Sequence, residues 1–116
     1  MRELGMSEMW PKLDHDEFTT FRFPRRDRDW EAGENVKVVF KPRSRERKVL
    51  GIAWIRSIEP RKLIGSSETT PPGITQDEAI ADGFKSHSAM LGWLAAHNGL
   101  PESDINKLTL RWFKRE

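Results

Sequence analysis

Residues 49–59 read VLGIAWIRSIE and carry the strongest strand signal in the chain. The run is apolar and rich in β-branched residues, which favours a strand over a helix. Gly51 lies inside it, and a glycine within a strand is typical of a bulge or a tight bend. The stretch therefore predicts one long, bent strand of the kind that small barrels use at their corners.

Three further segments alternate apolar and polar residues with period two, the pattern of a half-buried strand. They are FTTFRF (18–23), NVKVVFK (35–41) and KLTLRWF (107–113). Pro24 closes the first of them, because proline cannot donate a hydrogen bond to a ladder. In the last segment the leucines and the tryptophan share one face, which we expect to be buried.

Two short helices are expected between the long strand and the last one. Residues 75–78, TQDE, form a capping box, in which the first and last side chains bond to each other's backbone amides. Gly83 supplies the left-handed stop of this helix. The second helix runs through AMLGWLAAH (89–97), and Asn98-Gly99 ends it.

The remaining segments complete the expected architecture. Residues 1–16 are weakly patterned and form an N-terminal extension, with a helical turn that ends near Trp10 because Pro11 fits poorly inside a helix. Residues 60–74 form a long connection, and a loop of this length is either functional or mobile. Residues 17–116 then form one α+β domain, a small mixed β-barrel with two or three short helices packed at one side.

Composition narrows the function classes. The chain has 116 residues, enough for one domain, with 33% charged residues and a formal net charge of +2. Cysteine is absent, which excludes disulfides, thiolate catalysis and cysteine-based zinc sites. No apolar run approaches the ~20 residues that span a bilayer, and the N-terminus lacks the apolar middle of a secretory signal. We expect a cytoplasmic protein with no membrane partner.

Common cofactor and metal motifs are missing from the sequence. The three histidines lack the i,i+4 spacing of a helical metal pair. No P-loop, GxGxxG or GxSxG stretch is present. The sequence therefore predicts no metal and no cofactor, and it indicates no conventional hydrolase or nucleotide-binding motif.

Two charged segments are candidates for contact with an anionic polymer. KPRSRERK (41–48) lies at an expected hairpin tip, where long cations reach phosphates without demanding geometry. Its candidate contacts are Lys41, Arg43, Arg45, Arg47 and Lys48. The alternative is a solvated loop whose charges prevent edge aggregation. PRRDRD (24–29) favours a salt-bridged turn, because its two aspartates neutralise neighbouring arginines.

One face of the strand 18–23 carries Thr20 and Arg22. By spacing alone these side chains face water. The alternative is a cleft that binds phosphate or a planar polar group, which suits arginine because its fork bonds bidentately. Most aromatic side chains must fill the core, but Trp30 beside the charged turn and Trp93 on the second helix are candidates for a cleft wall.

The order of these segments resembles that of ASCH domains, small β-barrels of the PUA-like superfamily. The first half is similar in TTFRF, the charged turn, WEAGENVKVVF and VLGIAWIRSI. The second half is similar in ITQDEAIADGFKS, the following helix and the LTLRWF strand. The resemblance covers roughly residues 17 to 113. It implies a cleft between the sheet and the helical segment, where Thr20, Arg22 and the GFKS region converge.

The resemblance also implies a chemistry. PUA-like domains bind RNA, and some ASCH members are amidohydrolases that act on N4-acetylcytidine through a Lys-x-x-Thr-x-Arg stretch and a downstream acid. Here Thr20 and Arg22 match that stretch, Glu17 stands in place of the lysine, and the acid maps onto Asp82. A carboxylate cannot supply positive charge to a developing oxyanion. This departure counts against hydrolysis and leaves open whether the protein is an enzyme.

We therefore expect binding before catalysis. In the leading hypothesis Arg22, Lys85 and Thr20 hold a nucleotide of RNA, or a modified nucleoside, in the cleft. The cations of the loop 41–48 then steer the nucleic-acid backbone.

Two alternatives use the same sequence features differently. In the first, the protein is a nucleoside-directed amidohydrolase or ribonuclease that uses Thr20, Glu17 and Asp82. Lys12 or Lys85 could enter its site from elsewhere in the chain, although no spacing requires it. In the second, the charged turns dock a protein partner and no nucleic acid is involved.

Overall fold

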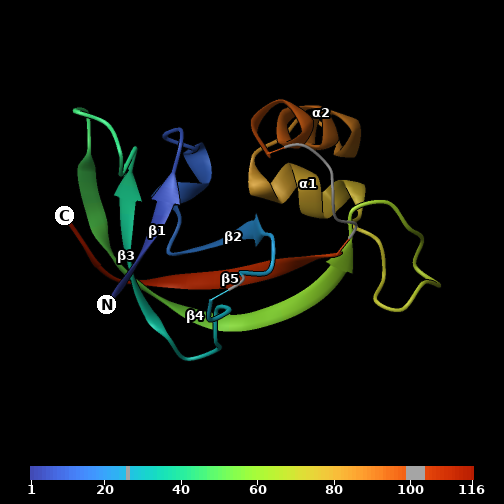
Figure 1. Ribbon diagram of the computed structural model, residues 1–116, viewed down its shortest axis with the longest axis horizontal. Coiled ribbons are helices and arrows are strands. Elements are labelled where there is room, and N and C mark those ends of the chain that lie inside the picture. Colours follow the sequence, from blue (N-terminus) through green and yellow to red (C-terminus); the bar gives the residue numbers. More distant parts are fainter. Residues whose placement is uncertain (26, 99–103) are drawn as a thin grey trace.

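The computed structural model describes residues 1–25, 27–98 and 104–116, in which a five-stranded mixed sheet carries two helices on one side (Figure 1). The strands are β1 (Arg2–Met6), β2 (Glu17–Arg22), β3 (Asn35–Phe40), β4 (Lys48–Lys62) and β5 (Asp104–Arg115). The helices are α1 (Gln76–Asp82) and α2 (His87–Asn98), and a short 3-10 helix, η1, spans Pro11–Asp14. The predicted α+β class with a mixed sheet is confirmed. Of the described helices, none has the length and apolar character needed to cross a membrane.

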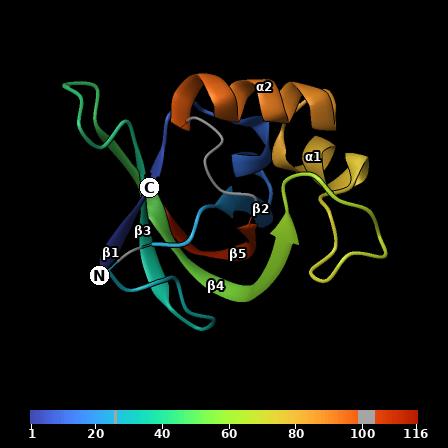
Figure 2. The ribbon, with the colours of Figure 1, turned by 45° about the vertical axis from the view of Figure 1, so that its right-hand side comes forward.

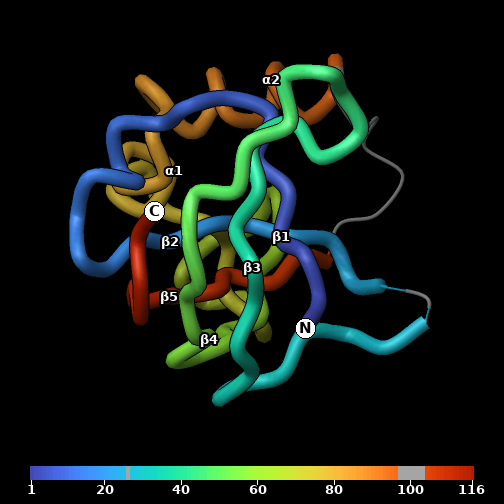
Figure 3. Tube along the Cα trace, turned by 90° about the vertical axis from the view of Figure 1, so that its left-hand side faces the viewer, coloured from blue at the N-terminus to red at the C-terminus, as the bar shows by residue number. Residues whose placement is uncertain are grey.

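The sheet is open rather than closed into a barrel. Its order is β1-β3-β4-β5-β2, with β1 parallel to β3 and the other neighbours antiparallel. In the described part of the chain no backbone ladder joins β1 to β2, so the predicted barrel is not confirmed. A side chain bridges these two edges instead, because the Arg22 guanidinium on β2 donates to the Gly5 carbonyl on β1 at 2.7 Å. Figure 3 shows β2 crossing behind β1.

The long central strand is bent as the sequence predicts. Gly51 has a φ of +146°, and a Cβ at this position would lie 2.2 Å from the carbonyl oxygen of Lys114 on β5. The ladder between β4 and β5 also shifts register at two places. These irregularities curve β4 beneath the helices (Figure 2).

The first strand is not anticipated by the sequence. Residues 1–16 were expected to form an extension with a helical turn before Pro11, but Arg2–Met6 pairs with β3 and the helical turn begins at Pro11. Five residues with the buried positions Leu4 and Met6 give too short an alternation to distinguish a strand from an irregular segment.

The helical segment follows its sequence signals. Thr75 and Glu78 form the predicted capping box, with nitrogen–oxygen distances of 3.1 and 3.0 Å. Gly83 ends α1 in the left-handed conformation with φ of +119°. The helix α2 reaches Asn98, whereas Gly99, part of its predicted stop, lies outside the described residues.

Buried side chains form two clusters whose junction positions the site. The larger cluster lies within the curved sheet and includes Leu4, Val36, Val38, Ala53, Ile55, Leu108 and Leu110. The smaller one lies beneath the helices and includes Phe21, Leu63, Ile74, Ala79, Met90, Leu94 and Ile105. The two clusters do not merge into one core. A cavity opens where they meet.

A candidate binding cleft between sheet and helices

A cleft of about 630 Å³ lies at this junction. Its lining comes from β1, β2, the segment around η1, the turn before β3, the loop before β4 and both helices. Its polar and charged side chains are Ser7, Lys12, Thr20, Arg22, Arg25, Arg43 and Asp82. Its aromatic side chains are Trp10, Phe21, Phe23, Trp30, Phe84 and Trp93. The volume suits a small-molecule or single-nucleotide ligand.

Arg22 places a cation inside the cleft without an acidic partner in contact. Its Nη2 donates to the Gly5 carbonyl and lies 3.5 Å from the Met6 sulfur, while its Nε donates to the Thr20 hydroxyl at 3.2 Å. In the described ranges Arg22 forms no ion pair. Burial lowers the pKa of its guanidinium to about 10, and attraction from Asp82 opposes this effect. The guanidinium therefore stays charged at neutral pH, and Asp82 compensates only part of that charge.

Lys12 and Asp82 form a buried ion pair beside Arg22. The Lys12 ammonium lies 2.6 Å from an Asp82 carboxylate oxygen and donates to the Thr19 carbonyl at 2.8 Å. Burial raises the pKa of Asp82 and lowers that of Lys12, and attraction between the two groups opposes both shifts. Asp82 is the last residue of α1, where the helix dipole disfavours a negative charge. Lys12 therefore compensates a carboxylate that is poorly placed by itself.

Three aromatic rings form a continuous wall of the cleft. Ring centroids of Trp10 and Phe84 lie 5.2 Å apart, those of Phe84 and Trp93 5.7 Å, and those of Trp10 and Trp93 5.9 Å. The wall requires Gly83, because a Cβ there would lie 3.0 Å from the Trp10 ring. Trp93 thus lines the cleft, as its position in the sequence suggested.

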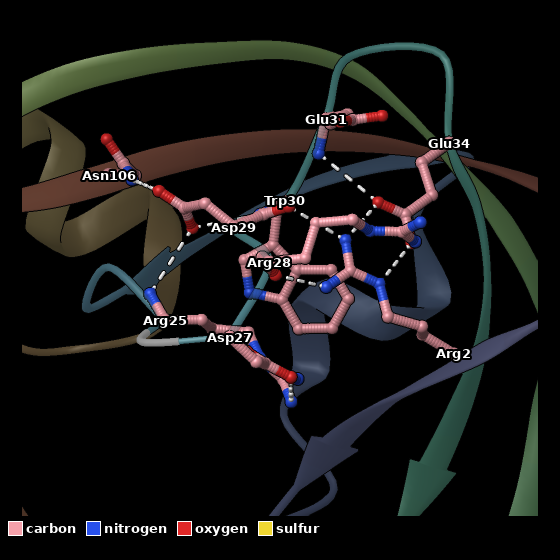
Figure 4. A network of polar contacts seen from close by, with 9 residues as sticks. All are labelled: Arg2, Arg25, Asp27, Arg28, Asp29, Trp30, Glu31, Glu34 and Asn106. Carbon is pink, nitrogen blue, oxygen red and sulfur yellow. Dashed lines mark hydrogen bonds and ion pairs between the residues drawn. The ribbon is translucent and has the colours of Figure 1, made fainter.

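Trp30, the other predicted wall residue, also lines the cleft and is held by cations. The guanidinium carbons of Arg2 and Arg25 lie 4.5 and 5.1 Å from its ring centroid. Arg2 is itself fixed by two hydrogen bonds to the Glu34 carboxylate, of 2.6 and 2.5 Å (Figure 4). The two guanidinium groups hold the Trp30 ring at the cleft and place positive charge against the face of that ring.

The turn before β3 is largely neutralised by its own acids. Arg25 pairs with Asp27 at 3.0 Å and Arg28 with Glu34 at 3.7 Å. Asp29 accepts a hydrogen bond from the Asn106 amide on β5. The salt-bridged turn is thus confirmed for Asp27, whereas Arg28 pairs with Glu34 outside the segment and Asp29 forms no ion pair with a described residue. Arg26 lies outside the described residues.

The basic loop 41–48 contributes one residue to the cleft. Arg43 lines it and forms no ion pair with any described residue. Lys41 pairs with Glu46 at 3.0 Å and Arg47 with Glu3 at 2.6 Å. The other two cations of the loop, Arg45 and Lys48, are exposed and form no ion pair with a described residue.

Glu17 and Lys85, which the sequence assigned to the cleft, lie outside it. Glu17 is exposed on β2 and accepts a hydrogen bond from Arg56 at 2.6 Å. It borders a second cavity of about 450 Å³, which shares Lys12 with the cleft. Lys85 is exposed and does not line the cleft. The cleft therefore collects Thr20, Arg22, Arg43 and Asp82 of the predicted set, and its one lining lysine among the described residues is Lys12.

From the sequence, Trp10 and Arg25 had no assigned cleft role. Trp10 and Lys12 flank Pro11 in a segment without periodicity, so no pattern assigns them a direction. Phe84 belongs to the GFKS region that the family resemblance placed at the cleft, and it lines the cleft.

No group of three or more potential metal ligands occurs in the part of the chain that the structure describes. Comparisons with family models, with curated proteins and with solved structures found no significant match to this chain.

Proposed function

We propose that this protein is an ASCH-type module with a variant PUA-like barrel, and that its cleft binds a nucleotide of RNA or a modified nucleoside. Arg22 carries this proposal, because it is a cation in an aromatic cleft with no ion-pair partner among the described residues. Burying a charge without a partner is costly. An anionic, planar ligand offsets that cost through the guanidinium while its base stacks on the rings. A cytoplasmic RNA is the partner we expect.

The charges at the cleft support an anion rather than a neutral ligand. Lys12, Arg22, Arg25 and Arg43 line it, whereas Asp82 is its one lining carboxylate among the described residues. Asp82 is already engaged by Lys12. The remaining positive potential favours a phosphate near Arg22 and Arg43.

The binding experiment is a titration with cytidine 5′-monophosphate and with a short RNA, followed by tryptophan fluorescence. We expect quenching, because Trp10, Trp30 and Trp93 all line the cleft. Binding of the RNA should weaken steeply with added salt. Replacing Arg43 by alanine should weaken binding and reduce the slope of log affinity against log salt by about 1.

Arg45→Ala is the matched control, since Arg45 belongs to the same loop and does not line the cleft. It should change affinity less than Arg43→Ala does. No quenching by either ligand at ~50 mM salt would contradict the proposal. Equal effects of the two variants would assign any binding to the general charge of the loop.

The Lys12–Asp82 pair favours a second candidate, a nucleoside-directed amidohydrolase. Glu17 in place of a lysine counts against hydrolysis, but Lys12 supplies an ammonium to the same cleft, beside the Thr20 strand. In this candidate a water adds to the amide carbonyl while Asp82 takes a proton from it, cationic groups stabilise the oxyanion, and Asp82 passes that proton to the leaving amine as the C–N bond breaks. Acid and amine are the products.

Incubation with N4-acetylcytidine, followed by chromatography for cytidine and acetate, tests this candidate. We expect Asp82→Asn and Thr20→Val to abolish turnover. Glu17→Gln is the control and should retain it, because Glu17 lies outside the cleft. Activity that survives in both cleft variants would refute these roles, while binding without turnover leaves the first proposal standing.

A further inference from the structure

The sheet face turned away from the helices carries cationic and aromatic side chains. Both helices lie on one side of β4 and β5, and no described element covers the other side (Figure 1). We call this surface the outer face. Its members on β3, β4 and β5 are Lys37, Ile52, Trp54, Arg56, Arg111, Phe113 and Lys114.

The alternation of burial places these residues. On β4, Ala53 and Ile55 are fully buried, so Trp54 between them faces the opposite side. On β5, Leu110 is buried and Arg111 is exposed. Trp54 pairs directly with Arg111 across the strands. An aromatic ring and a guanidinium are thereby fixed side by side on a rigid sheet.

Two bulges bring additional side chains to this face. The register of β4 on β5 passes from Ile55 to Ser57 and so skips Arg56, whose guanidinium lies 5.6 Å from the Trp54 ring. The register also skips Phe113, between the partners of Ala53 and Ile52. Phe113 is 76% exposed. Its ring is therefore accessible to a ligand.

The outer face has an excess of positive charge. Lys37, Arg111 and Lys114 form no ion pair with any residue that the structure describes. Glu17 is the neighbouring carboxylate, and Arg56 already binds it at 2.6 Å. The uncompensated cations favour an anionic partner, and the exposed Phe113 ring beside the half-buried Trp54 ring favours one with flat apolar groups.

We propose that the outer face binds a segment of single-stranded nucleic acid. Bases stack on Trp54 and Phe113, while Arg111, Lys37 and Lys114 contact phosphates. Stacking on sheet aromatics tolerates any base and leaves the phosphates to the surrounding cations. Trp54 and Phe113 are diagonal neighbours on adjacent strands, roughly 8 Å apart. The surface lies on the opposite side of the sheet from Arg22, so it does not depend on what the cleft binds.

The experiment measures fluorescence anisotropy of a labelled oligouridylate of about 12 nucleotides, within the usual site sizes of small single-strand-binding domains. The wild-type protein should bind it at ~50 mM salt. Phe113→Ala should weaken binding by roughly 5- to 100-fold through the loss of one stacked base. Arg111→Ala should reduce the slope of log affinity against log salt by about 1. Thermal unfolding of both variants should match the wild type, because the two side chains are exposed.

Two controls separate this surface from other sources of binding. Lys62→Ala removes one positive charge near the other end of β4, where Lys62 pairs with Asp104, and should leave affinity unchanged. Arg43→Ala alters the cleft, and the fold-loss caused by Phe113→Ala should be the same in the Arg43→Ala background as in the wild type. If Arg43→Ala alone weakens binding, the oligonucleotide occupies the cleft and the outer-face proposal is wrong. Absence of oligouridylate binding, or wild-type affinity in both Phe113→Ala and Arg111→Ala, would also overturn it.

Discussion

At the scale of single residues, the ion pair between Lys12 and Asp82 dominates the interior of the cleft. Both residues are nearly inaccessible, with 7% and 6% of their surfaces exposed. A buried pair gains little over an apolar pair of the same size, but removal of one partner leaves an uncompensated charge. The pair is therefore better understood as fixing the position of Asp82 than as a source of stability.

Lys12→Met should consequently destabilise the protein by about 3–5 kcal/mol at neutral pH. The pKa of Asp82 is already raised by burial and rises further without Lys12. Between the unfolded and folded pKa values, the native state holds a proton that the unfolded state lacks. The variant should therefore lose part of its deficit as pH falls.

Urea unfolding at neutral and acidic pH measures this effect. The double variant Lys12→Met, Asp82→Leu should regain most of the stability at neutral pH. Lys85→Met is the matched control, because Lys85 is an exposed lysine without an ion pair to any described residue. A pH-independent deficit would show that lost packing, and not the charge of Asp82, causes the effect.

At the scale of elements, α1 is tied to the sheet through one carboxylate. Glu78 completes the capping box at Thr75 and also accepts hydrogen bonds from Arg61 on β4 and Lys107 on β5. Burial acts to raise the pKa of Glu78, but the bonds from Arg61, Lys107 and Thr75 together outweigh it and lower the pKa to about 2. The cap that begins the helix thus also positions Asp82 over the cleft.

Glu78→Gln should reduce stability by roughly 1 to 3 kcal/mol at pH 7. A depressed pKa contributes stability above the unfolded value of 4.5 and loses it as pH falls toward about 2. The wild type should therefore lose its advantage over the variant across this acidic window, as followed by urea unfolding. Asp77→Asn, one position earlier in the same turn, is the control and should leave the pH dependence unchanged.

At the scale of the whole molecule, the fold follows from sequence where a pattern is long or a signal is local. The bent strand was readable from Gly51 within an apolar run, and α1 from its cap and its glycine stop. The strand β1 was not readable, because its five residues are shorter than a dependable alternation. The contact between the sheet edges β1 and β2 was also not predictable from the sequence. It is made by the Arg22 side chain between strands that share no ladder.

The cleft was readable only in part for the same reason. Thr20 and Arg22 alternate on one strand face, so it was predictable that they share a direction. Spacing alone favoured water as that direction and was wrong, because Thr20 is buried and both residues line the cleft. Lys12 enters from a 3-10 helix, and its contact with Asp82 joins residues 70 positions apart. No spacing rule reaches across such a separation. Glu17, which shares the strand with Thr20, instead turns outward to Arg56.

The pairing of β2 has a consequence for how the protein is made. Within the described residues β2 has β5 as its one ladder partner, with Glu17 opposite Arg111 and Arg22 opposite Asn106. During synthesis the strand that carries Thr20 and Arg22 must wait for β5, more than 80 residues later in the sequence, before it can dock. Contacts this distant in sequence slow folding and leave early segments exposed. A nascent chain on the ribosome therefore holds every cleft residue before it holds the strand that completes the cleft.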